Sequence, residues 1–196
     1  MPGNNRRNAG SKSRGAGVRR VVSAEAPGPQ PHASIAGDPE TLRLLNAVLK
    51  NELTAINQYF LHSRMLADWG LSELAKKEYE ESIDEMKHAD RLIKRILFLG
   101  GLPNLQDMGK LMIGENVQEV ITCDLSLEMR SFPDLKMAIP YCETTKDFGS
   151  RELFVEILES EEEHIDWLQT QLRLIEQMGL QNFVQLQTKP NATSSS

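Results

Sequence analysis

Apolar residues recur every three or four positions along four long stretches of the chain, the spacing that places them on one face of an α-helix. The first stretch follows Asp38 and Pro39, an N-cap acid and a proline at the first helical position, and it stops at Gly70. We therefore predict four long helices and a short fifth one, over residues 39–69, 72–99, from 117 onward, 150–178 and 180–187.

The third of these helices contains Pro133 and Pro140. Each proline removes a helical hydrogen bond and clashes with the preceding turn, so we expect the helix to be interrupted and kinked at both positions. Residues 100–115, between the second and third helices, can extend over about 50 Å, whereas a helix the length of 72–99 spans about 42 Å. The predicted fold is all-α: a four-helix bundle with a long crossover and a short fifth C-terminal helix.

Charge is distributed unevenly along the chain. Residues 1–37 hold six cations against Glu25 alone, a net charge of +5 that leaves −11 for the rest of the total of −6. This segment is rich in Gly, Ser, Pro and Asn and has little to bury, so we predict a disordered basic leader over residues 1–37. It precedes a folded domain over 38–187 and a flexible tail over 188–196. The acidic domain disfavours nucleic acid as a partner and attracts cations.

The leader leaves three interpretations open: an extension without function, an organelle transit peptide, or a nucleic-acid-binding arm. Cys123 and Cys142 lie about 28 Å apart along the predicted third helix, beyond disulfide reach, which favours a reducing, cytoplasmic location. No apolar run approaches the roughly 18–20 residues of a membrane span, and the N-terminus lacks the apolar core of a secretory signal. We therefore expect no membrane partner.

Two Glu-x-x-His tetrads, at residues 85–88 and 161–164, lie in the middle of the second and fourth predicted helices. A Glu and a His three residues apart face the same side of a helix and can bind one metal ion. The first and third helices each place one acid on an otherwise apolar face. Burying four carboxylates together is strongly unfavourable unless cations neutralise them. We therefore predict a metal centre formed by six side chains: Glu52, Glu85, His88, Glu128, Glu161 and His164.

These residues lie within motifs that resemble those of bacterioferritin. The similarity covers residues 35 to about 186 and includes NQYFLH at 57–62, ESIDEMKHAD at 81–90, GLPNLQD at 101–107, DLSLE at 124–128 and EEEHIDW at 161–167. The resemblance implies a ferritin-like bundle that stores and detoxifies iron. Fe(II) would be oxidised to Fe(III) by O2 or peroxide at a di-iron ferroxidase centre. The mineral would be deposited inside a hollow homo-oligomer of 24 subunits built from dimers.

The resemblance also implies a role for each predicted site residue. Glu52 and His88 would bind one iron, and Glu161 and His164 the other. Glu85 and Glu128 would bridge the two irons, and the Tyr59 hydroxyl would order a bridging carboxylate.

Met86 points about 100° away from the metal-facing side of its helix. Its thioether is a soft ligand suited to haem iron, and the resemblance implies a haem b shared between the Met86 side chains of two subunits. It further implies a ferredoxin-type reductant for iron release.

The chain departs from the family pattern at one iron site on the inner shell wall, where Glu80 replaces a histidine beside Asp84. Trp167 has two interpretations, an electron donor during oxygen reduction or a packed aromatic. Three other functions stay open. A rubrerythrin-like di-iron peroxidase usually carries a Cys-x-x-Cys domain that this sequence lacks. A DNA-protecting shell would use the basic leader, and a haem-dominated electron carrier would depend on Met86.

Overall fold

The computed structural model describes residues 36–188, which contain five helices and no strand. The helices are α1 (Pro39–Asp68), α2 (Ser72–Phe98), α3 (Val117–Thr144), α4 (Phe148–Met178) and α5 (Leu180–Leu186). The all-α prediction is confirmed. Most of the predicted leader lies outside the described residues, as does the tail from residue 189 onward. No helix within 36–188 combines the length and apolar character needed to cross a bilayer.

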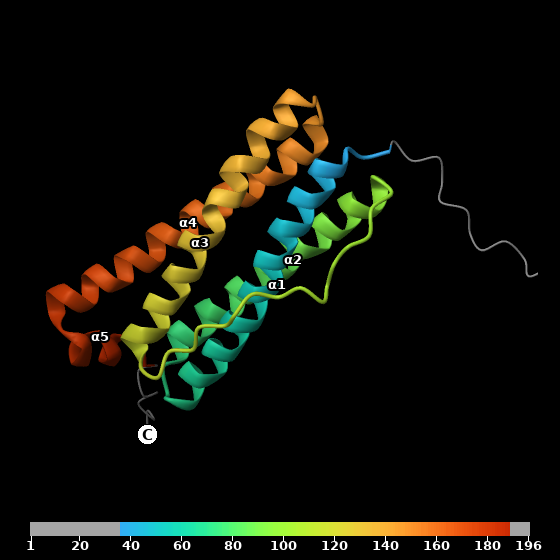
Figure 1. Cartoon of the computed structure of the whole chain (residues 1–196). Coiled ribbons are helices and arrows are strands. Elements are labelled where there is room, and N and C mark those ends of the chain that lie inside the picture. The colour runs from blue at the N-terminus through green and yellow to red at the C-terminus, as the bar shows by residue number, and fades with distance from the viewer. Residues whose placement is uncertain (1–35, 189–196) are drawn as a thin grey trace, which may run out of the picture. The chain divides into compact units, whose positions relative to one another are not determined.

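Local sequence signals account for the helix ends. The Asp38 carboxylate accepts a hydrogen bond from the Thr41 amide at 2.9 Å, and the Asn116 side chain accepts one from the Glu119 amide at 3.0 Å. Between α1 and α2 the chain turns at Gly70, whose φ of +82° is a conformation that glycine adopts without strain. The short turn makes α1 and α2 an antiparallel hairpin, and α3 and α4 form a second one (Figure 1).

The expected interruption of the third helix is wrong, because α3 continues through both prolines. Pro133 and Pro140 are exposed, so the carbonyl groups that lose a helical partner lie on the side open to water. The opposite side of α3 buries Leu135, Ala138 and Cys142 in the core. This packing holds the helix together where two hydrogen bonds are missing.

The crossover between α2 and α3 runs along α1, as Figure 1 shows. Polar side chains of α1 accept hydrogen bonds from backbone amides of the crossover: Asn46 from Asn104, Thr54 from Gly109 and Gln58 from Met112, each at 2.8 Å. Lys50 adds an ion pair to Asp107 at 2.9 Å. Together with Lys50, the three acceptors recur every four residues, on one side of the helix. The crossover is therefore fixed lengthwise, and it delivers α3 beside α1 in a defined register.

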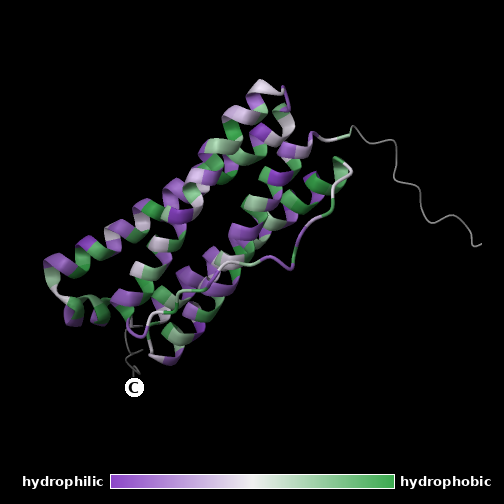
Figure 2. Ribbon diagram, in the orientation of Figure 1, coloured by the Kyte–Doolittle hydropathy of each residue, from purple (hydrophilic) through white to green (hydrophobic). Residues whose placement is uncertain are grey.

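Most of the apolar core lies in two large clusters. One cluster packs Leu45, Leu49, Leu92, Ile96 and Phe154 at one end of the bundle, and the other packs Leu66, Ile121, Leu168, Ile175 and Phe183 towards α5. Hydrophobic and hydrophilic residues accordingly alternate along each ribbon in Figure 2. The middle of the bundle, between the clusters, contains buried acids and histidines.

Candidate metal centre

The six side chains predicted to bind metal meet in the middle of the bundle, and all four long helices contribute. Glu52 comes from α1, Glu128 from α3, and each Glu-x-x-His pair from α2 or α4. The four glutamates and His164 each expose 4% or less of their surface. The side chain of His88 is slightly more open, at 12%.

The six residues form two overlapping groups, each with ligand atoms that lie within 4.8 Å of one another. The first group is Glu52, Glu85, His88 and Glu161, and the second is Glu85, Glu128, Glu161 and His164. His88 Nδ1 lies 3.0 Å from a Glu85 oxygen and 3.3 Å from a Glu52 oxygen. His164 Nδ1 lies 3.1 Å from Glu128 Oε1. Two cation sites that share carboxylates fit this arrangement.

The shared carboxylates differ from the expected pair. Glu85 belongs to both groups, as expected for a bridging ligand, but its companion is Glu161, whereas Glu128 belongs to the second group only. Glu128 instead accepts hydrogen bonds from His164 Nδ1 and from the Tyr59 hydroxyl. The geometry therefore favours Glu85 with Glu161 as the central pair.

Several atoms of the centre are buried without a hydrogen-bond partner: Glu52 Oε2, Glu161 Oε2 and His164 Nε2. Burial raises the pKa of Glu52 to about 7, and burial together with neighbouring carboxylates raises the pKa values of Glu85 and Glu161 well above their usual range. The metal-free core therefore keeps part of its carboxyl groups neutral. A bound cation would reverse this effect, because it stabilises the ionised form.

The pKa of Glu128 shifts in the opposite direction to the pKa values of the other three glutamates. Burial acts to raise its pKa, but hydrogen bonds from His164 and Glu161 outweigh burial, and the pKa of Glu128 is lowered. Burial likewise acts to lower the pKa of His164, and its hydrogen bond to Glu128 raises that pKa on balance. In the absence of metal, Glu128 is thus the ionised acid of the group, paired with His164.

Tyr59 lies beside the centre as a fully buried hydroxyl. It donates to Glu128, and its ring meets the His164 ring edge-on, with 5.2 Å between the centroids. Burial, followed by the nearby carboxylates, raises the pKa of Tyr59 well above its usual range. The hydroxyl therefore stays protonated and can orient Glu128.

The sequence interpretation assigned no role to a second layer of buried polar groups. Asp124 Oδ1 accepts from Gln58 at 2.8 Å and lies 2.8 Å from His62 Nδ1, while His62 Nε2 accepts from the Gly114 amide. Glu78 is fully buried and both its carboxylate oxygens lack a partner. The signal for this layer was the i, i+4 spacing: Asp124 and Glu128 are four residues apart, as are Gln58 and His62.

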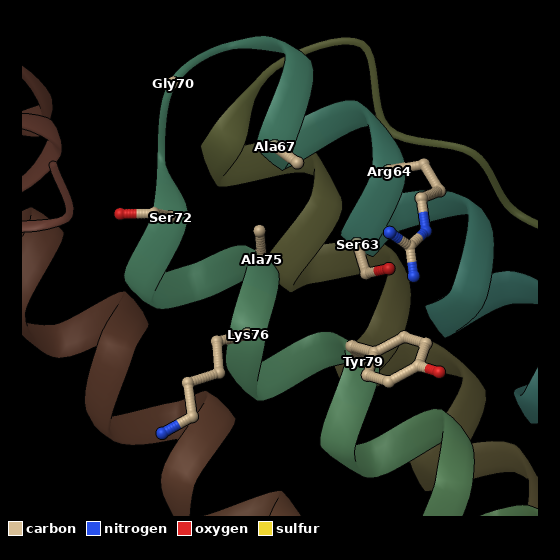
Figure 3. A pocket seen from close by; sticks show the side chains of 8 residues that line it. All are labelled: Ser63, Arg64, Ala67, Gly70, Ser72, Ala75, Lys76 and Tyr79. Carbon is tan, nitrogen blue, oxygen red and sulfur yellow. The ribbon is translucent and has the colours of Figure 1, made fainter. Parts of the chain in front are cut away.

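Met86 lies outside the metal centre, half exposed on α2. It lines an open cavity of about 270 Å³ with six other residues of α1 and α2: Ile56, Asn57, Phe60, Tyr79, Ser82 and Ile83. A neighbouring cavity of about 390 Å³ lies near the α1–α2 turn (Figure 3), and Arg64 at its edge stacks 4.8 Å from the Tyr79 ring. The two cavities share Tyr79, and neither includes a residue of the metal centre.

Two residues were expected at the inner wall: Glu80 is exposed, and Asp84 is partly buried. Glu80 lies 3.7 Å from Lys76, and Asp84 lies 2.5 Å from Lys87. The two carboxylates thus face separate lysines. The Trp167 ring lies 6.1 Å from the His164 ring, which makes it a neighbour of the metal centre.

Comparison with known proteins identifies the class of protein to which the chain belongs. The profile of the Ferritin family, described as a ferritin-like domain, matches residues 42–178. Among curated proteins, the chain is 48% identical over 154 residues to the bacterioferritin of Brucella melitensis and 46% identical over 154 residues to that of Rhodobacter capsulatus. Each alignment covers 79% of this chain and 96% of the relative. Bacterioferritin of Mycobacterium leprae is 50% identical over 143 residues, which cover 73% of this chain and 90% of the relative. The chain belongs to the bacterioferritin family.

Proposed function

We propose that this protein stores and detoxifies iron, and that its buried centre oxidises Fe(II). The observation that carries the proposal is the pair of overlapping carboxylate–imidazole groups in the middle of the core, with atoms that lack any partner. Membership of the bacterioferritin family supports the same function.

The donor set fits two iron ions. Carboxylate oxygen and imidazole nitrogen suit ferrous iron, and four glutamates balance the charge of two divalent cations. Glu52 and His88 would hold one ion, and Glu128 and His164 the other. Glu85 and Glu161 would lie between them, since both groups share these two carboxylates. When bound, the two Fe(II) ions would supply two electrons to O2 or peroxide.

Residues around the centre exclude water from it and orient its ligands. The apolar clusters on both sides of the centre exclude water, which strengthens electrostatic interactions at the site. Binding two cations displaces the protons that the metal-free core keeps on Glu85 and Glu161. Tyr59 holds Glu128 in place through its hydrogen bond and keeps its own proton.

A shell of identical subunits, 24 in number and built from dimers, would hold the mineral. Exposed apolar side chains support association: Phe60, Leu61, Tyr79 and Met86 on α1 and α2, and Leu102, Leu105 and Met108 on the crossover. Exposed apolar side chains that gather in patches mark protein–protein contact surfaces.

Met86 would hold a haem b between the α1–α2 faces of two subunits. Met86 offers an exposed thioether next to a mostly apolar cavity, and a symmetric dimer would supply a second Met86 from the other subunit. The haem would give the protein a redox group for iron release, with a ferredoxin-type protein as the reductant. The acidic domain disfavours nucleic acid, and a reducing cytoplasm remains the proposed location.

Stopped-flow oxidation of Fe(II) by the iron-free protein tests the proposal. We expect a fast phase that saturates at about two Fe(II) per subunit, and the loss of this phase in Glu85→Ala and in His164→Ala. Glu159→Gln, an exposed change on the same helix as His164, is the matched control and should keep the phase. An unchanged fast phase in both alanine variants would refute the proposed ferroxidase function.

A further inference from the structure

Three side chains outside the six ligands close one side of His164: Lys77, Glu81 and Trp167. Glu81 lies on α2 one turn before Glu85, and its Oε2 is 3.9 Å from His164 Nδ1. The other oxygen, Oε1, forms an ion pair with Lys77. The Lys77 ammonium in turn lies 5.5 Å from the centre of the Trp167 ring. Glu81 thus has one oxygen directed at the metal centre and the other at a cation of the protein.

Side-chain exposure rises stepwise along this series. His164 exposes 3%, Glu81 9% and Lys77 36%. Lys77 is therefore the outermost member, Glu81 lies beneath it, and His164 belongs to the buried centre.

The distance between Glu81 and His164 suits two ligands of one ion. Metal bonds to carboxylate oxygen and imidazole nitrogen are about 2.0–2.2 Å long, so two ligand atoms of one ion can lie up to about 4.4 Å apart. The 3.9 Å between Glu81 Oε2 and His164 Nδ1 falls within this limit. Glu81 needs no large movement to share an ion with His164.

Lys77 is an unusual neighbour for a cation site, because its ammonium repels an incoming divalent ion. Its charge is engaged by Glu81 and by the face of Trp167. The adjacent Lys76 provides the contrast. It pairs with Glu80 at 3.7 Å with both side chains more than half exposed, as ordinary surface ion pairs are.

We propose that Glu81 is a further binding residue for the divalent cation in the His164 half of the centre, and that Lys77 is a positioning residue that competes with this cation for Glu81. Without metal, Lys77 holds the Glu81 carboxylate. When a cation binds at Glu81 Oε2, it shares the charge of the carboxylate with Lys77, and the Lys77 pair is weakened. This inference rests on the proposed function, because it assumes that the centre binds divalent cations.

Titration of the iron-free full-length protein with Co(II) tests the inference. Visible absorption reports the bound ion. In a Trp69→Phe background, tryptophan fluorescence reports the surroundings of Trp167 alone, because the chain has only these two tryptophans. Lys77→Met removes the ammonium and keeps the side-chain stem, and we expect it to tighten the Co(II) site at His164 about threefold to tenfold. Glu81→Gln removes the carboxylate charge and should weaken the same site about tenfold. The double variant should behave like Glu81→Gln, since Lys77 acts through Glu81.

Lys76→Met is the matched control, with the same charge change one residue earlier, and it should leave both Co(II) affinities within about twofold. Lys77→Gln provides a second variant with a polar side chain at the same position. Wild-type protein that binds two Co(II) per subunit, with affinities unchanged in the Lys77 and Glu81 variants, would overturn this inference alone. Wild-type protein that binds no Co(II) would overturn the proposed function and this inference together.

Discussion

Replacing Glu161 by glutamine should have opposite effects on the metal-free and the metal-bound protein. Glu161 is buried, belongs to both ligand groups and has one oxygen without a partner. Burial and the carboxylates of Glu85 and Glu128 raise its pKa well above the usual range, so the metal-free protein keeps it neutral. Glutamine retains the size, the neutrality and the hydrogen bond to Glu128. It loses the capacity to become a carboxylate ligand.

The expected change in the free energy of unfolding follows from the cost of keeping the Glu161 carboxyl group protonated. Holding a carboxyl group protonated at about pH 7.5, roughly three pH units above its ordinary pKa of 4.5, costs up to about 4 kcal/mol at 1.36 kcal/mol per unit. Neighbouring carboxyl groups share this cost, so we expect Glu161→Gln to raise the free energy of unfolding of the metal-free protein by about 2 kcal/mol. The melting temperature should rise by about 4–8 °C.

With metal bound, wild type should be more stable than Glu161→Gln. A ligand at 100 times its Kd stabilises a protein by about 2.7 kcal/mol per site, or about 5 kcal/mol for two sites. Because both groups include Glu161, the variant should lose most of this gain.

The assay is calorimetric melting at equal protein concentration, with and without Co(II), and Glu159→Gln on the exposed side of α4 is the control. The reasoning is wrong if metal-free Glu161→Gln is less stable than wild type, or if Co(II) stabilises both proteins equally.

Three further predictions concern the surroundings of the centre. Tyr59→Phe removes the hydrogen bond to Glu128, and we expect Fe(II) oxidation in the fast phase to slow about tenfold or more with two ions still bound, measured by stopped-flow absorption; an unchanged rate would exclude this role. Met86→Leu keeps an apolar side chain but no sulfur, so the haem absorption bands of the purified protein should disappear while the oxidation rate persists; retained bands would point to another ligand. Burial raises the pKa of Glu52 from 4.5 to about 7, so its stabilising contribution is complete below about pH 4.5 and is lost as the pH rises through 7. Urea unfolding of metal-free protein should therefore show falling stability from about pH 5 to pH 7.5, and a rise over this range would contradict the assignment.

The sequence predicted which six side chains meet in the core, because the signal is local. A Glu-x-x-His pair faces one side of its helix whatever the neighbours do, and Glu52 and Glu128 interrupted otherwise apolar faces. The helix ends were predictable for the same reason, since caps and glycines act within a few residues. The sequence did not predict which two carboxylates are shared between the ligand groups. Whether Glu161 or Glu128 is shared depends on the rotation and spacing of the packed helices.

The prolines of α3 and the Lys77–Glu81 pair show the same limit. A proline in a helical pattern usually ends or bends the helix, but Pro133 and Pro140 face solvent, while their neighbours on the opposite side are fixed in the core. Lys77 and Glu81 form an ordinary i, i+4 pair in the sequence. Their place above His164 depends on the packing of α2 against α4.

The central claim is that side chains of four helices hold two cations at one buried position. Anomalous diffraction at the iron edge, from crystals soaked in Fe(II) without oxygen, locates such ions directly. We predict two iron peaks per subunit, one within ligand distance of His88 and one within ligand distance of His164, with Glu85 and Glu161 between them. Crystals in which iron is bound elsewhere on the subunit, while the six side chains keep their metal-free positions, would contradict the account.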